Sequence, residues 1–494
     1  MPPRPLLPLP ALTLLLAALL LAGLGPLRAA PPLATRPHIL WIVLDDIGGT
    51  FPHFGQTALA TPNLDRLARE GTRFANAFLT ASVCSPSRSA LITGMYQTTI
   101  AAHHHRSGRG SEKIYLPPPL EPLPALLQRV GYYTCNTGDP AQTPAPGKTD
   151  YNFQWSPRLY DGIDWSTRAP GQPFFAQIQL WGGKNRNDNG RWYRQVAPPI
   201  LKTLTDPAAV TLPPYYPRDP LILADWAQYL DCIRYSDWQI GQILQRLQQE
   251  NLLDQTLLIV LGDNGISAAR EKQFLYDGGI RTPLFVRGPG IPRDAVRRDL
   301  VEHIDLAATA LAWAGLPIPS WMQGRDLFAT AAAPRDAVFA ARDRCDETVD
   351  RIRSVRTLQF KYLRNFHPQR PLLQPNDYKD SKPTLQRLRQ LHADGQLSLL
   401  EEATLFAPTR PTEELYDLAA DPAEIHNLAS DPAHRATLES LRARLDRWIA
   451  ETRDPGPESR QQYDSDMAAA QQTQTSPAFK NNVALMKQWA REGK

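Results

Sequence analysis

From His38 to about Leu316, apolar runs alternate with turn residues and helical stretches. Three of the runs, His38 to Leu44, Gly171 to Leu180 and Thr256 to Leu261, are apolar almost throughout. Such runs are typical of strands buried on both faces of a parallel sheet. Helical stretches lie between them, one of which opens with Thr61 and Pro62. The alternation predicts an α/β fold with a doubly wound, mostly parallel sheet flanked by helices.

The pattern changes after Pro334. Ala337 to Ala341 and Arg353 to Arg364 have the mixed faces of antiparallel strands, and a helix is predicted from His434 to Thr452. The residues from Asp454 onwards are polar, so we expect a loosely packed tail. The predicted organisation is a main α/β domain over 36–335, a smaller C-terminal α+β domain with an antiparallel sheet over 336–453, and the tail over 454–494.

The first residues indicate export. Arg4 precedes an apolar run from Ala11 to Leu24, which is too short to span a membrane as a helix. The run is typical of a secretory signal peptide over residues 1–30, cleaved near Ala29 or Ala30. No later apolar run reaches membrane length, so we expect a secreted or periplasmic protein without a stable membrane anchor.

Net charge and cysteine content limit the partners and the disulfides that we expect. The formal net charge is +4, which is too close to balance to indicate a nucleic-acid partner. Four cysteines are few for an exported chain of this size, so disulfides are not its main source of stability. Whether any of Cys135, Cys232 and Cys345 pair is left open by the sequence.

Two predicted strands end in pairs of oxygen-donor side chains. Asp45 and Asp46 follow the first run, and Asp263 and Asn264 follow the run that begins at Thr256. Ligand groups in open α/β sheets gather at the carboxyl ends of strands, and adjacent carboxylates repel unless a cation lies between them. Oxygen donors indicate a hard cation, Ca²⁺ as first choice and Mg²⁺ as second. Either pair alone is equally typical of a turn.

The stretch from Ala81 to Met95 carries Cys84, Pro86 and Arg88 at alternate positions. The residues after Arg88 predict a helix with Pro86 in its first turn, so Cys84 would lie by the helix N-terminus. Free N–H groups and the helix dipole favour an anion there, such as sulfate or phosphate. The tract from His103 to His105 is typical of a polar loop from which one histidine reaches the site.

Together these motifs resemble type I sulfatases, within the alkaline phosphatase superfamily. The resemblance extends over nearly the whole chain that follows the predicted signal peptide. It rests on the Asp-Asp pair after the first strand and on the segments CSPSRSALITG, GKTDYNF, PFFAQIQL, VLGDNG, YDGGIRTP, HIDLAATALAWAG, MQGRDL and ELYDLAADPAEIHNLA. It implies an enzyme that hydrolyses the O-sulfate or N-sulfate of a small molecule or saccharide.

By this resemblance, Cys84 is oxidised to formylglycine by a formylglycine-generating enzyme, and the hydrated aldehyde is the nucleophile. One hydroxyl attacks sulfur, and the other is then deprotonated to release sulfate. Arg88 fixes the hydrate, while Lys148 and Lys272 bind sulfate oxygens and stabilise the leaving oxygen. The implied cation ligands are Asp45, Asp46, Asp263, Asn264 and an oxygen of residue 84.

Two positions depart from the family pattern. Asp150 follows Lys148 by two residues, where many sulfatases have histidine, and Lys184 stands near a second such position. The base is therefore open. Asp150 is our first choice because residues two apart on an extended segment face the same side. His104 and His105 are the alternatives and candidate substrate ligands, and Lys184 is either a sulfate ligand or a solvated loop residue.

Two other functions compete with this interpretation. A phosphate or phosphonate monoester hydrolase of the same superfamily would use similar residues, but a phosphate monoester dianion needs more compensating positive charge than a sulfate monoanion. A sulfated-glycan binder without turnover would fit the missing histidines, although it would need neither the nucleophile nor the full cation set.

Overall fold

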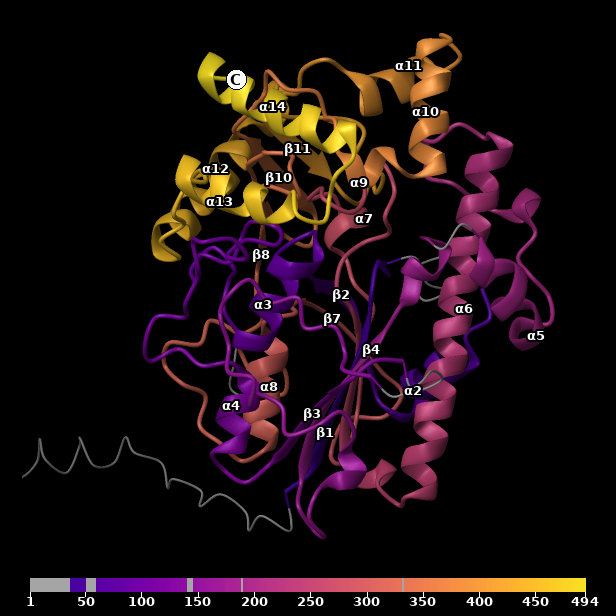
Figure 1. The fold of residues 1–494 in the computed structure, drawn as a ribbon, viewed down its shortest axis with the longest axis vertical. Coiled ribbons are helices and arrows are strands. Elements are labelled where there is room, and N and C mark those ends of the chain that lie inside the picture. Colours follow the sequence, from indigo (N-terminus) through magenta and orange to yellow (C-terminus); the bar gives the residue numbers. More distant parts are fainter. Residues whose placement is uncertain (1–35, 50–58, 140–144, 188–189, 331–332) are drawn as a thin grey trace, which may run out of the picture.

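The computed structural model describes residues 36–49, 59–139, 145–187, 190–330 and 333–494. Its largest element is a seven-stranded sheet in the order β3-β4-β1-β5-β6-β2-β7, with helices on both faces (Figure 1). Every pairing in this sheet is parallel except the two made by β6. The predicted doubly wound, mostly parallel α/β fold is confirmed.

The elements of this domain follow one another in alternation. Its strands are β1 (His38–Leu44), β2 (Thr72–Phe78), β3 (Tyr133–Thr137), β4 (Phe174–Leu180), β5 (Thr256–Gly262), β6 (Leu284–Arg287) and β7 (Ala295–Glu302). Its α-helices are α2 (Pro62–Glu70), α3 (Cys84–Thr93), α4 (Leu123–Gln128), α5 (Ala197–Leu201), α6 (Pro220–Gln249), α7 (Asp277–Ile280) and α8 (Asp305–Trp313).

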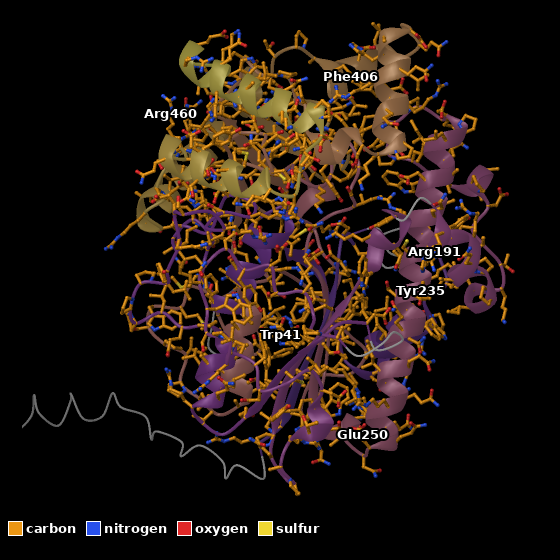
Figure 2. The ribbon with its side chains drawn as sticks, in the orientation of Figure 1. Trp41, Arg191, Tyr235, Glu250, Phe406 and Arg460 are labelled. Atoms are coloured by element: carbon orange, nitrogen blue, oxygen red, sulfur yellow. The ribbon has the colours of Figure 1, made fainter. Side chains whose placement is uncertain are left out.

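Strand β1 explains how the sheet is buried on both sides. Its even-numbered residues from Leu40 to Leu44 join a core with residues of α2 and α6. Its odd-numbered residues from Ile39 to Val43 join a second core with residues of α3, α4 and α8. Trp41 belongs to this second core and is labelled in Figure 2. Each fully buried apolar side chain of this size contributes about 1.5–3 kcal/mol, which holds the strand ends in place.

The smaller domain is built on a four-stranded antiparallel sheet in the order β11-β10-β9-β8. Its strands are β8 (Val338–Arg342), β9 (Ile352–Arg356), β10 (Phe360–Asn365) and β11 (Glu413–Asp417). Its helices are α9 (Asp377–Asp380), α10 (Pro383–Ala393), α11 (Leu399–Glu401) and α12 (Arg435–Glu451). Leu445 and Trp448 of α12 pack in one core with Val355 of the sheet. The predicted antiparallel sheet is therefore present.

The prediction of a loosely packed tail from Asp454 is wrong. This segment forms α13 (Arg460–Ala470) and α14 (Pro477–Glu492), whose residues Met467, Phe479 and Met486 share a core. Buried ion pairs also hold it, because Arg344 contacts Glu458 Oε2 at 2.8 Å and Asp466 Oδ2 at 2.6 Å. Its few apolar residues recur at helical spacing, so a polar composition conceals two packed helices.

One sequence prediction, the signal peptide over 1–30, lies outside the described residues. Within the part of the chain that the structure covers, no helix is both long and apolar enough to cross a membrane.

Candidate active site

The four predicted cation ligands lie together at the carboxyl ends of β1 and β5. These strands are parallel neighbours with Leu44 opposite Gly262, so the residues that follow them are adjacent. The Asp46 N–H donates to Asp263 Oδ1 at 3.0 Å, and Asn264 Nδ2 donates to Asp46 Oδ1 at 2.8 Å. All four side chains, Asp45, Asp46, Asp263 and Asn264, are buried.

Two glycines let the loop after β4 lie against this pair of aspartates. A Cβ on Gly182 would lie 2.3 Å from the Asp45 carbonyl oxygen, and one on Gly183 would lie 2.5 Å from that of Asp46. Gly182 also has a φ of +51°, which glycine adopts without steric cost. The close approach brings Lys184 Nζ to 2.8 Å from Asp45 Oδ1.

Cys84 is the first residue of α3 and is buried. Its Sγ lies 3.3 Å from Lys272 Nζ, 3.8 Å from Lys184 Nζ and 3.9 Å from Asp45 Oδ1. Burial would raise the pKa of the thiol, but the charges of Lys148, Lys184 and Lys272 outweigh burial and lower it. Residue 84 therefore lies where a negatively charged group is stabilised.

Three lysines surround the aspartates. Lys272 Nζ lies 2.6 Å from Asp46 Oδ1, and Lys148 Nζ lies 2.8 Å from Asp45 Oδ2. Lys184 occupies the third position, so it belongs to the cluster and is not a solvated loop lysine. The three ammonium groups converge around residue 84 and could bind the oxygens of a tetrahedral anion.

Arg88 joins the helix that begins at Cys84 to Asp263, which follows β5, and to Gln179 of β4. Its Nε donates to Asp263 Oδ2 at 2.8 Å, and its Nη1 donates to Gln179 Oε1 at 2.6 Å. Gln179 was missed by sequence reasoning, although two glutamines at alternate positions of an apolar strand were a signal. Because Arg88 is buried and held by a carboxylate and an amide, its position is fixed.

Asp150 lies beside Lys148, but not for the reason that the sequence suggested. Asp150 has a φ of +56°, so the segment is not extended at this residue. One carboxylate oxygen contacts Arg109, and the other lies 3.4 Å from Lys148 Nζ. Burial would raise the pKa of Asp150, but Lys148, His105 and Arg109 hold it well below its usual range. A carboxylate paired in this way is a weak base.

The histidine tract divides between two environments, and all three rings are buried instead of lying in a solvated loop. His105, Cys84 and Asp150 each place a possible ligand atom within 4.8 Å of those of the other two. His104 instead groups with His103 and Asp343. The structure therefore brings His105, but not His104, to residue 84.

Asp346 orients His105 and was also missed by sequence reasoning. Its Oδ1 lies 3.0 Å from His105 Nδ1, and the buried Nε2 of the same ring has no hydrogen-bond partner. Burial alone would lower the pKa of His105, but Asp346 and Cys345 outweigh it and hold the pKa well above its usual value. Nothing in the sequence around Asp346 indicated this contact.

The oxygen donors fit a hard cation. Asp46 Oδ2 and Asn264 Oδ1 are buried without a hydrogen-bond partner, and buried polar atoms in that state are rare unless water or an ion completes them. Carboxylate and amide oxygens are the ligands that Ca²⁺ and Mg²⁺ prefer. The residues present therefore suit the cation that the sequence predicted.

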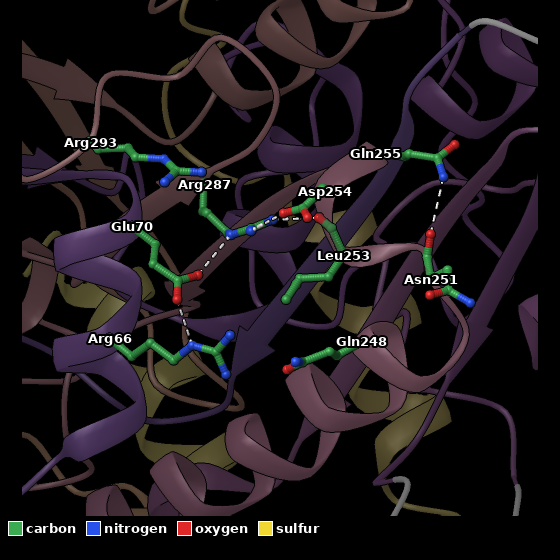
Figure 3. Close-up of a pocket in the computed structure, with 9 residues that line it drawn as sticks. All are labelled: Arg66, Glu70, Gln248, Asn251, Leu253, Asp254, Gln255, Arg287 and Arg293. Atoms are coloured by element: carbon green, nitrogen blue, oxygen red, sulfur yellow. Dashed lines mark hydrogen bonds and ion pairs between the residues drawn. The ribbon is translucent and has the colours of Figure 1, made fainter.

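A hollow at the other end of the sheet is separate from this cluster. It measures about 510 Å³ and is lined by Arg66, Glu70, Gln248, Asn251, Leu253, Asp254, Gln255, Arg287 and Arg293. In Figure 3, Arg287 reaches from Glu70 to Asp254. None of the predicted site residues lines it.

The four cysteines, all of which are described, are free thiols.

The fold is a doubly wound α/β sheet with a buried cluster of lysines and oxygen donors around the first residue of α3, and comparison with known proteins gives the family. Residues 37–316 match the sulfatase family model, and residues 267–377 match the model for the C-terminal part of N-sulphoglucosamine sulphohydrolase. The chain therefore belongs to the sulfatase family and is a sulfuric ester hydrolase.

Relatives agree with this assignment, and a solved structure shares the fold. An ulvan-active sulfatase of Formosa agariphila is 33% identical over 458 residues, which cover 84% of this chain and 75% of that protein. Human N-sulphoglucosamine sulphohydrolase is 30% identical over 486 residues, covering 88% and 93%. A structure solved with its substrate D-glucosamine-2-N,6-O-disulfate shares the fold, with a TM-score of 0.60 and 17% identity over 86% of this chain and 100% of that one.

Proposed function

We propose that this protein removes sulfate from a sulfated saccharide, with the oxidised side chain of residue 84 as nucleophile and Ca²⁺ beside it. One observation carries the proposal. Cys84 begins α3 with Lys272 and Lys184 at 3.3 and 3.8 Å from its sulfur, next to four buried oxygen-donor side chains. The modification would require a formylglycine-generating enzyme, and the apolar run near the N-terminus supports export to the periplasm or medium.

The residues of the cluster divide the work of the reaction. Asp45, Asp46, Asp263 and Asn264 would hold the cation, which when bound supplies positive charge that polarises the oxygens of residue 84 and sulfate. Lys148, Lys184 and Lys272 bind sulfate oxygens and stabilise charge on the leaving oxygen. Arg88 keeps Asp263 and residue 84 in register because it is anchored on Gln179.

His105 is the group that we propose moves protons next to residue 84. Its buried Nε2 has no hydrogen-bond partner, the ring groups with Cys84 and the partly buried Asp150, and Asp346 fixes the ring through Nδ1. Asp150, our first choice from the sequence, is engaged by Arg109 and Lys148. The geometry therefore favours His105 as the proton-transfer group and Asp150 as a residue that positions Lys148. The protonated ring would first donate its proton to the leaving oxygen and, then neutral, accept the proton of the second hydroxyl.

The substrate class is tested by sulfate release from a panel of compounds, measured by ion chromatography. The panel contains N-sulfated glucosamine, heparan sulfate oligosaccharides, ulvan oligosaccharides, and a phosphate and a phosphonate monoester. We expect sulfate release from at least one saccharide by the wild-type protein and none by Cys84→Ala. Hydrolysis of the phosphonate or phosphate with no sulfate release from any saccharide would contradict the proposal.

A further inference from the structure

A second cluster of metal-ligating side chains lies beside the first. His103 and His104 follow α3, and Asp343 follows β8 directly. Each of the three offers a ligand atom, and these atoms lie within 4.8 Å of one another. All three side chains are buried, with exposed fractions of 6%, 5% and 3%. The mechanism proposed above uses none of them.

Each of these residues has a buried polar atom without a hydrogen-bond partner. The atoms are His103 Nδ1, His104 Nδ1 and Asp343 Oδ2. Buried polar atoms in that state are rare unless water or an ion completes them. The other oxygen of Asp343 accepts from Arg353 Nη2 at 3.0 Å, so the carboxylate is fixed while Oδ2 stays free.

Salt bridges surround the cluster. They link the carboxylates of Asp343, Asp454, Glu458 and Asp466 to Arg344, Arg351 and Arg353. Glu458 Oε1 also lies 4.0 Å from His104 Nδ1. Burial and the nearby arginines lower the pKa of both histidines, that of His103 to about 3.

We propose that His103, His104 and Asp343 bind a divalent transition-metal cation, of which Zn²⁺ is the representative, with Glu458 as a nearby fourth ligand. Two imidazole nitrogens and a carboxylate suit Zn²⁺, whereas Ca²⁺ and Mg²⁺ prefer oxygen alone. The ion would join the histidine loop, the segment after β8 and the segment before α13. It is structural, because four protein side chains would fill its coordination positions, as in closed structural zinc sites.

Metal analysis of the whole protein tests this proposal. Protein is purified without chelators from zinc-supplemented medium, and zinc and calcium are measured separately by plasma mass spectrometry. We expect about one equivalent of zinc, as for a structural site, and its loss in His103→Gln and Asp343→Asn. His426→Gln, a change at an exposed histidine, should keep it. Folded wild-type protein that contains no transition metal would overturn the proposal.

A second measurement covers the case in which a variant does not fold. Zinc is removed from wild-type protein with 1,10-phenanthroline, and Co²⁺ is added while visible absorption is recorded. Bands of protein-bound Co²⁺ are expected in the wild type and in His426→Gln, but not in folded Asp343→Asn. Equal bands in Asp343→Asn, or no bands in the wild type, would overturn the proposal. Sulfate release plays no part in either readout, so failure here is distinct from failure of the proposed function.

Discussion

The two clusters on either side of the histidine tract differ in the groups that surround their carboxylates. At residue 84, Asp45 and Asp46 are each paired with a lysine, at 2.8 and 2.6 Å. In the cluster of His103, His104 and Asp343, three buried polar atoms lack hydrogen-bond partners. The histidine loop reaches both clusters and lies along the segment after β8, since the His105 N–H donates to the Arg344 carbonyl oxygen at 2.8 Å. Consecutive residues of one loop therefore enter two different chemical environments.

The difference teaches how donor type separates the two sites. The first cluster offers oxygen donors and surrounds them with ammonium groups, an arrangement that suits a hard cation and a tetrahedral anion. The second offers ring nitrogens and one free carboxylate oxygen, which suits a transition metal. Changes in one cluster should therefore leave the metal of the other in place, and the following predictions use this separation.

The largest effect is expected at residue 84. Cys84→Ala removes the proposed nucleophile, so sulfate release should fall by more than about a thousandfold, in the range known for loss of a covalent nucleophile. Thermal unfolding should show that this variant is folded, and metal analysis should show that it still contains zinc. Cys232→Ala is the control, because Cys232 is buried in a separate core with Trp192 and Tyr235. Retained turnover in Cys84→Ala would contradict the assignment.

Loss of the hard cation comes next. Asp263→Ala removes a carboxylate from a site that needs several oxygens, so affinity for Ca²⁺ should fall by more than about a hundredfold. Activity should fall with it, while the zinc content stays unchanged. Asp254→Ala, at a side chain that is 86% exposed, should alter neither the affinity for Ca²⁺ nor the activity. Calcium retained at full occupancy in Asp263→Ala would show that the ligands lie elsewhere.

Two variants distinguish His105, the proposed proton-transfer group, from its neighbour Asp150. His105→Gln should reduce turnover by about a hundredfold or more, the usual contribution of a general acid or base. Asp150→Asn should cause a smaller loss, mainly in KM, because it weakens the position of Lys148. The variant that lacks the proton-transfer group should show a burst of released alcohol followed by slow sulfate release, because the release of sulfate from residue 84 is stalled. A burst in Asp150→Asn and not in His105→Gln would return the role to Asp150.

The smallest effect on activity is expected from removal of the transition metal. Treatment with 1,10-phenanthroline should lower Tm, because an ion present at 100 times its Kd stabilises the folded state by about 2.7 kcal/mol. Turnover measured well below Tm with Ca²⁺ present should change little. Zinc added back should restore Tm in the wild type but not in Asp343→Asn. An unchanged Tm after complete removal of zinc would contradict a structural role.

The sequence predicted the parts of this molecule that depend on local pattern. Apolar runs such as Thr256 to Leu261 became central strands, and the donors at their ends met because parallel neighbours end at one edge. Contacts that depend on distant segments were not predictable: Asp346 reaches His105 only because the segment after β8 lies along the histidine loop. Polar composition also concealed α13 and α14, whose apolar residues are few but spaced for a helix.

The central claim is that residue 84 acts as an oxidised cysteine, and the mass of the peptide that contains it tests this most directly. Active protein is digested, and the peptide spanning Cys84 is weighed. We expect a mass about 18 Da below that of the thiol form, because an aldehyde replaces the CH₂SH group. Fully active protein in which this peptide carries only the unmodified thiol would contradict the account.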